Sequence, residues 1–103
     1  MGIRITIPDE KIAGFCRKGH IRSLALFGSV LRDDFGPDSD VDVLIEFEPG
    51  REPGLMKFVA MQDELAVILG RKVDLVERKA VESSENYIRR RHVLESMEHV
   101  YVA

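Results

Sequence analysis

Cysteine, aromatic residues and long apolar runs are all scarce in this sequence, and each shortage excludes a class of protein. Cys16 is the single cysteine, so no disulfide within the chain and no cysteine-based zinc site can form. The charge-free stretches, such as 23–31, fall far short of the roughly 20 apolar residues that span a bilayer. Arg4, Asp9 and Glu10 would interrupt the apolar core of a signal peptide. We therefore expect a cytoplasmic protein that does not enter a membrane.

Length and composition limit the chain to one compact unit. With 103 residues, of which 45% are hydrophobic and 32% charged, it can build one core but not two. We predict a single domain over residues 1–103. The net charge of −3 argues against general nucleic-acid binding, and we expect no direct nucleic-acid contact. Acidic side chains dominate from 33 to 52, whereas basic ones gather at 78–79 and 89–91.

Hydrophobic periodicity and turn residues predict alternating helices and strands. In chain order we expect a helix over 8–18, a strand over 22–27, a short helix over 30–34, a strand over 41–47, a helix over 55–68, a strand over 72–77 and a helix from 83 or 84 to about 97. Residues 99–102 fit either an extension of the last helix or an added edge strand. This order predicts an α/β (α+β) fold, in which helices pack on one face of a small mixed sheet of three or four strands.

Aspartates occupy positions in two predicted strands where an acidic side chain is unusual. Asp40 and Asp42 are two residues apart, so strand alternation places both on one face, opposite their apolar neighbours. Asp74 repeats this arrangement in the next predicted strand. Asp has a low strand propensity, and a buried unpaired carboxylate is costly. If the two strands are neighbours, the three carboxylates repel one another unless a cation lies between them, and oxygen ligands alone suit Mg²⁺ or Mn²⁺.

A phosphate-binding turn is predicted where the first strand ends. Gly28 permits a sharp turn and the close approach of a phosphate, and Ser29 can cap a helix whose free N–H groups attract anions. Arg32 could reach a phosphate or an acceptor, although an ion pair with a neighbouring acid is an equal alternative. A phosphate cradle beside paired metal ligands indicates nucleotidyl transfer, in which two metal ions activate a hydroxyl and stabilise pyrophosphate. Asp74 would then bind the catalytic metal and help to deprotonate the acceptor.

Other motifs that bind metals or phosphates do not fit. Aspartates at 38, 40 and 42 match the first three ligand positions of a calcium loop. The sixth position, however, holds Val43 where glycine is required, and the twelfth holds Pro49 where glutamate is required. The chain has no P-loop and no dinucleotide fingerprint either. Nucleotidyl transfer therefore remains the chemistry that these residues indicate best.

The sequence around these residues resembles a known family. The segments LFGSVLR (26–32) and PDSDVDVL (37–44) resemble the glycine-serine and paired-aspartate signature of the DNA polymerase β-like nucleotidyltransferase superfamily. Within it, the chain is most similar to the prokaryotic minimal nucleotidyltransferase (MNT) group. The resemblance extends to Asp74 and to Tyr87-Ile88-Arg89 of the last helix, and so covers nearly the whole chain. It implies a nucleotidyltransferase fold.

The resemblance also implies an activity and a partner. Proteins of this group are antitoxins paired with HEPN-domain ribonuclease toxins, and some transfer AMP from ATP to a tyrosine of the toxin. We therefore expect an Mg²⁺-dependent enzyme with two metal ions that forms a hetero-oligomer with a HEPN toxin; the chain alone could also form a homodimer. Two alternatives stay open. One is an antitoxin that neutralises its partner by binding only, and the other is transfer to a small-molecule acceptor, as in aminoglycoside nucleotidyltransferases.

Overall fold

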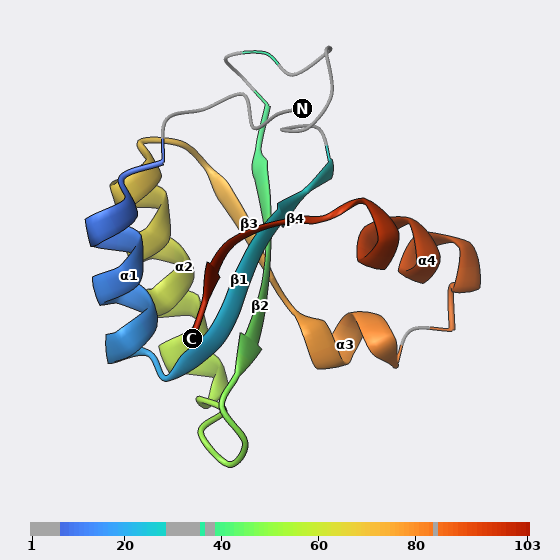
Figure 1. The fold of residues 1–103 in the computed structure, drawn as a ribbon, viewed down its shortest axis with the longest axis horizontal. Coiled ribbons are helices and arrows are strands. Elements are labelled where there is room, and N and C mark those ends of the chain that lie inside the picture. Colours follow the sequence, from blue (N-terminus) through green and yellow to red (C-terminus); the bar gives the residue numbers. More distant parts are fainter. Residues whose placement is uncertain (1–6, 29–35, 37–38, 84) are drawn as a thin grey trace.

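The computed structural model describes residues 7–28, 36, 39–83 and 85–103, and Figure 1 shows their arrangement. In chain order the elements are α1 (Asp9–Lys18), β1 (Ile21–Phe27), β2 (Val41–Phe47), α2 (Leu55–Leu69), β3 (Val73–Glu77), α3 (Arg78–Glu82), α4 (Tyr87–Ser96) and β4 (Glu98–Val102). The predicted alternation is confirmed over these residues. The short helix expected over 30–34 lies outside them. Each described helix is too short or too polar to cross a bilayer.

The four strands form one mixed sheet in the order β3-β2-β1-β4. β1 is antiparallel to both β2 and β4, whereas β2 and β3 are parallel. Parallel neighbours need a crossover connection, and α2 supplies it. The predicted mixed α/β fold is therefore confirmed. The uncertain segment 99–102 belongs to the added edge strand, β4, which pairs with β1.

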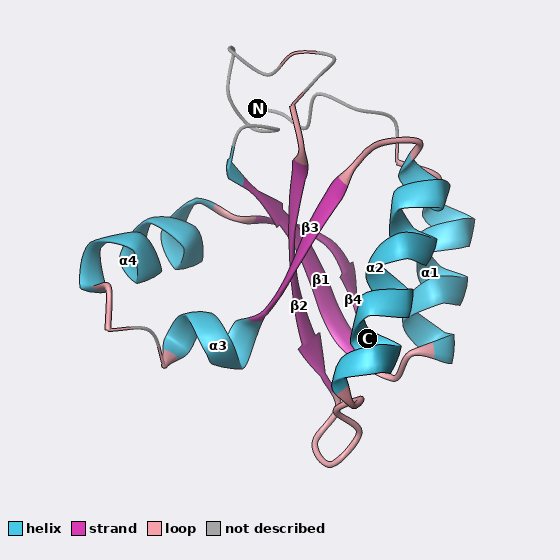
Figure 2. Cartoon of the chain, turned by 180° about the vertical axis from the view of Figure 1, so that it is seen from behind, coloured by secondary structure: helices cyan, strands magenta, loops and turns pink. Residues whose placement is uncertain are grey.

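One face of the sheet is covered by α1 and α2, which lie side by side in Figure 2. Alternate residues of β2 point into this layer and are at most 5% exposed: Val41, Val43, Ile45 and Phe47. They pack with buried side chains of the two helices: Ile12, Phe15, Cys16, Met61 and Leu65. This arrangement confirms that the apolar neighbours of the aspartates face the main core, so the carboxylates emerge on the other side of the sheet.

Cys16 behaves as a small apolar residue of the main core. Its side chain is fully buried in the main core. Burial raises the pKa of its thiol to about 12, and the charge of Arg17 opposes this shift only in part. The thiol therefore stays protonated at neutral pH and has little nucleophilic reactivity.

The other face of the sheet carries α3 and α4, which corrects the expectation that helices pack on one face only. Val81 of α3 and Val93 of α4 pack against Phe27 and Leu44 of the sheet. Figure 1 shows these two helices on the side away from α1 and α2. The predicted last helix is confirmed as α4, Tyr87–Ser96, although it begins later than the expected caps at 83 or 84, and the short helix α3 was not predicted. A short helix immediately after β3 brings Val81 onto the sheet, and α4 begins only at Tyr87.

Gly70 ends α2 in a left-handed conformation, with φ of 67°. An added Cβ would meet no atom within 4 Å there, so Gly70→Ala should lower the free energy of unfolding by about 1 kcal/mol through backbone strain alone. Gly14, inside α1, also has no atom within 4 Å of an added Cβ. Gly14→Ala should raise the free energy of unfolding by about 0.5–1 kcal/mol, because alanine favours helix. Urea denaturation measures both, and equal effects would contradict the left-handed cap.

Candidate active site

Asp42 and Asp74 are direct partners across the parallel strands β2 and β3. Residues paired in this way lie about 4.8 Å apart and point to the same face of a sheet. Asp42 is half-buried and Asp74 is exposed, whereas the residues on either side of Asp74 are buried against the main core. From the sequence alone, the aspartates come together only if the two strands are neighbours, and the structure shows that they are. The register places these two carboxylates together on the face opposite α1 and α2.

Gly28 brings the end of β1 directly beside Asp42. Phe27, the last residue of β1, is the cross-strand partner of Asp42, and Gly28 follows with φ of 77°. A Cβ on Gly28 would overlap the Asp42 carboxylate oxygen and would lie 3.2 Å from its Cγ. Only glycine combines this backbone conformation with room for the carboxylate. The predicted phosphate turn and the carboxylates therefore meet at one end of the sheet.

Asp40 is exposed and lies immediately before β2, at the end of a hydrogen-bonded turn. The Ser39 N–H donates to the Gly36 carbonyl at 3.1 Å, and the Gly36 N–H donates to the Ser39 hydroxyl at 3.0 Å. Arg71, between α2 and β3, donates from Nη1 to both carbonyls, at 3.1 Å to Gly36 and 3.3 Å to Ser39. Arg71 thus ties the segment before Asp40 to the start of β3.

Sequence reasoning did not identify Arg71, and no motif around it could have done so. Arg71 holds the segment before Asp40 through hydrogen bonds to residues more than 30 positions earlier in the chain. We expect Arg71→Met to lower the rate of the nucleotidyl transfer that the sequence predicts about tenfold, the usual cost of losing one or two charge-assisted hydrogen bonds. It should also raise the Mg²⁺ concentration needed for half-maximal activity. Arg17→Met, on the other face, is the control, and an unchanged Mg²⁺ requirement for Arg71→Met would contradict the positioning role.

Two of the predicted site residues, Ser29 and Arg32, lie outside the described part of the chain. Within the residues that the structure does describe, no three His, Cys, Asp or Glu side chains form a ready-made metal cluster. Asp42 and Asp74 share a register position, and Asp40 precedes the same strand by one residue. The described part of the fold therefore brings two carboxylates together, those of Asp42 and Asp74, and not three.

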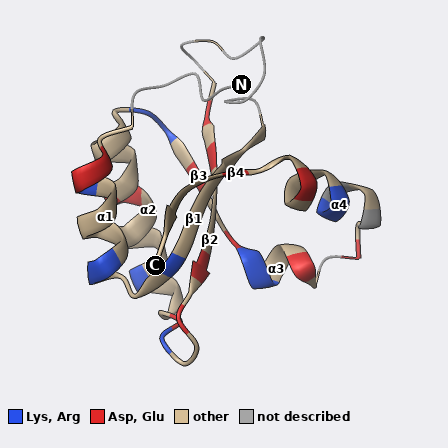
Figure 3. Cartoon of the chain, in the orientation of Figure 1, with Lys and Arg blue, Asp and Glu red and all other residues tan. Residues whose placement is uncertain are grey.

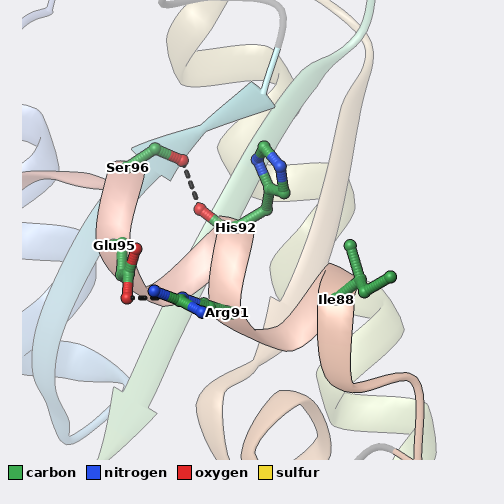
Figure 4. Close-up of a pocket in the computed structure, with 5 residues that line it drawn as sticks. All are labelled: Ile88, Arg91, His92, Glu95 and Ser96. Carbon is green, nitrogen blue, oxygen red and sulfur yellow. Dashed lines mark hydrogen bonds and ion pairs between the residues drawn. The ribbon is translucent and has the colours of Figure 1, made fainter.

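A groove of about 540 Å³ follows α4. Its described lining residues are Ile88, Arg91, His92, Glu95 and Ser96. Figure 4 shows Arg91 paired with Glu95, at 3.1 Å, and the Ser96 hydroxyl donating to the carbonyl of His92. No motif in the sequence indicates this groove.

Opposite charges are paired at the far end of β2, away from the carboxylates. Figure 3 shows acidic residues at both ends of β2 and basic ones at the start of α3. Lys79 of α3 and Glu52 are joined by an ion pair of 2.7 Å. The hydrogen bond from Lys79 lowers the pKa of Glu52, and the same bond raises the pKa of Lys79. Both groups are exposed, so this pair contributes little to stability.

Comparison with known proteins assigns the family. Residues 9–98 match the nucleotidyltransferase domain family, and the chain belongs to that family. A protein of Thermococcus cleftensis named protein adenylyltransferase MntA is 40% identical over 63 residues, which cover 61% of this chain and 62% of that protein. The chain thus aligns with less than two thirds of the length of this relative.

Two solved structures share the fold. A crystal structure of a toxin-antitoxin with AMP-PNP contains a chain that is 19% identical, with a TM-score of 0.70, over 94% of this chain and 75% of that one. A structure of a tri-AMPylated Shewanella oneidensis HEPN toxin in complex with an MNT antitoxin gives 20% identity and a TM-score of 0.62, over 92% and 70% of the two chains. The nucleotidyltransferase fold expected from the sequence is confirmed.

Proposed function

We propose that this chain is a cytoplasmic Mg²⁺-dependent protein adenylyltransferase and acts as the antitoxin of a HEPN-domain ribonuclease toxin. It would transfer AMP from ATP to a tyrosine hydroxyl of the toxin. The observation that carries the proposal is the meeting of Asp42, Asp74 and Gly28 at one end of the sheet. The names of the Thermococcus and Shewanella proteins support the nature of the substrate and of the partner.

The donor set fits Mg²⁺. Asp42 and Asp74 are hard oxygen ligands on neighbouring strands, and their shared face is accessible because Asp74 is exposed. These two residues would hold the metal, with Asp40 as the third carboxylate, and we propose that two ions bind during the reaction. Bound Mg²⁺ would neutralise the developing charge on the pyrophosphate and favour ionisation of the acceptor hydroxyl.

The residues of the chain have separable tasks in this reaction. The turn at Gly28 would bind the phosphates through its backbone, and Asp74 would orient the acceptor hydroxyl and receive its proton. The tyrosine oxygen attacks the α-phosphorus of ATP in line. A new oxygen–phosphorus bond forms while the bond between the α-phosphorus and the bridging oxygen breaks, and pyrophosphate leaves. Alignment of the two reactants, rather than covalent help from the enzyme, would account for most of the rate.

The Shewanella toxin carries three AMP groups. We propose that this chain likewise transfers more than one AMP to its partner.

Labelled ATP tests the proposal directly. The chain and a purified HEPN-domain partner are incubated with Mg²⁺ and with ATP labelled at either the α- or the γ-phosphate. The α-label should appear on the partner and the γ-label should not, because it leaves with pyrophosphate. EDTA should abolish the transfer, and added Mg²⁺ or Mn²⁺ should restore it. Label from the γ-phosphate on the partner would indicate phosphoryl transfer instead and would reject the proposal.

The same assay separates catalysis from simple occlusion. Neutralisation of the toxin by both the wild type and Asp42→Ala, without label on the toxin, would favour an antitoxin that acts only by binding. Transfer to an aminoglycoside but not to the HEPN protein would favour the small-molecule alternative.

A further inference from the structure

The outer face of α2 carries apolar side chains that are exposed in the described part of the chain. Met56 and Val67 are 88% and 82% exposed, and Val59 is 47% exposed. The opposite side of the helix is apolar too, because Met61 and Leu65 pack into the main core. A helix that is apolar on both sides is usually covered on both sides. Here α1 and β3 pack along the inner side (Figure 2), so the outer face suits contact with another chain.

The outer residues of α2 have the spacing of a helix–helix seam. They follow one another at intervals of four, three and four residues: Met56, Ala60, Asp63 and Val67. These intervals place one stripe of side chains along the line where two helices lie side by side. The small side chain of Ala60, near the middle of the stripe, lets two backbones approach closely.

The charges beside this stripe are complementary to a second, antiparallel copy of the helix. Lys57 and Glu64 are seven residues apart, so both flank the stripe on the same side. In an antiparallel pair, Lys57 of each copy lies within reach of Glu64 of the other, whereas a parallel pair would bring like charges together. Glu64 accepts a hydrogen bond from Lys18 of its own chain at 2.6 Å, and a carboxylate has the capacity to bind both lysines.

We infer that the outer face of α2 is the contact of a homodimer, in which two copies of this chain pair their α2 helices antiparallel about a two-fold axis. Met56 of each copy packs against Val67 of the other. Asp63 lies opposite Ala60 and beside Lys57 of the other copy, which offsets its charge. The apolar seam supplies the affinity, and the charges set the antiparallel direction.

The contact is small, so the dimer should be weak. α2 has 15 residues and is therefore about 22 Å long. Two such helices bury less than about 1,200 Å², and we expect a dissociation constant of roughly 10–100 µM. The helix lies on the face of the sheet opposite Asp42 and Asp74, so the dimer leaves both carboxylate sites open.

Sedimentation equilibrium of the whole chain, from about 5 to 500 µM, tests the dimer. The mass of the wild type should rise from 11.7 kDa toward twice that value. Val67→Asp should weaken the dimer about 100-fold, because it places a charge in the apolar seam. Ile88→Asp is the matched control, since Ile88 is 70% exposed on α4 and should leave the dimer unchanged. Circular dichroism should show the same fold for both variants, because both side chains are exposed.

Charge reversal tests the antiparallel direction. Lys57→Glu and Glu64→Lys should each weaken the dimer about tenfold, because each change places like charges within reach of one another. An equimolar mixture of the two variants should dimerise as well as the wild type. One chain then carries two acids at these positions and the other two bases, so every facing pair is again opposite in sign. A mixture that dimerises no better than either variant alone would reject the antiparallel arrangement.

Other results would assign the surface differently. A wild type that stays monomeric up to about 500 µM would overturn the inference, and so would a dimer that Val67→Asp leaves intact. If the wild type is monomeric and Val67→Asp abolishes its binding to the purified HEPN-domain partner, the outer face of α2 belongs to that contact and the homodimer is rejected. Sedimentation does not depend on AMP transfer, so it judges the dimer whether or not the proposed function holds.

Discussion

Replacement of Asp42 by Asn should lower the rate of AMP transfer by about 10³-fold, equivalent to roughly 4 kcal/mol of transition-state stabilisation. The amide keeps the size of the side chain but removes the negative charge that holds a divalent cation. Asp42 lies between Asp74 and the Gly28 turn, so no other described carboxylate can take its place. Initial rates of label transfer at saturating ATP and Mg²⁺ measure the effect.

The fold should survive this substitution, because Asp42 is outside the main core. Circular dichroism and the thermal midpoint of Asp42→Asn should match those of the wild type. Asp63→Asn, on the exposed surface of α2, changes the same functional group on the other face of the sheet and should leave transfer unaffected. Transfer by Asp42→Asn at a rate near that of the wild type would exclude Asp42 as a metal ligand.

Replacement of Gly28 by Ala should lower both activity and stability. The left-handed backbone, with φ of 77°, and the overlap of the new methyl group with the Asp42 carboxylate should together cost about 1–3 kcal/mol of unfolding free energy. Relief of the overlap requires Asp42 to move away from Asp74 or the turn to shift. Because displacement of reacting groups by about 1 Å can cost 10²-fold in rate, we expect a loss of about that size.

Gly70→Ala separates these two effects. Gly70 has nearly the same φ, 67°, but an added Cβ has no neighbour within 4 Å. It should therefore share the loss of stability from backbone strain and keep full activity. If Gly28→Ala loses only as much activity as Gly70→Ala, the close approach of Gly28 to Asp42 is irrelevant to catalysis.

Local sequence patterns were sufficient to predict the strand that carries Asp42 and the helix that follows it. The alternation of Val41, Asp42 and Val43 predicts both the strand and the opposite faces of its side chains, and β2 has the predicted bounds. Likewise, the apolar periodicity from Leu55 and the stop at Gly70 predict α2. These signals are local, because side-chain alternation and helical periodicity repeat within a few residues.

Contacts between distant segments explain what the sequence did not reveal. α3 has five residues and no side-chain cap, so Val81 holds it in place through its packing against Phe27 and Leu44. β4 depends on pairing with β1, more than 70 residues earlier in the chain. The pairing of Asp42 with Asp74 also requires the crossover through α2, and Arg71 acquires its role only in the folded chain. The roles of Ser29 and Arg32 remain predictions.

The separation of core and site predicts that the carboxylates can be altered without unfolding the domain. The main core lies between the sheet and the layer of α1 and α2, whereas Asp42 and Asp74 emerge on the other face. A strand can serve both purposes, because successive side chains point in opposite directions. Loss of activity at the aspartates and loss of stability at the core positions should therefore be independent.

Anomalous scattering from Mn²⁺ in crystals of the chain with AMP-PNP would test the central claim most directly. A peak should lie between the Asp42 and Asp74 carboxylates, with metal–oxygen distances of about 2.1–2.2 Å and with a phosphate oxygen beside the Gly28 turn. A Mn²⁺ peak bound to the nucleotide but ligated by neither aspartate would contradict the account.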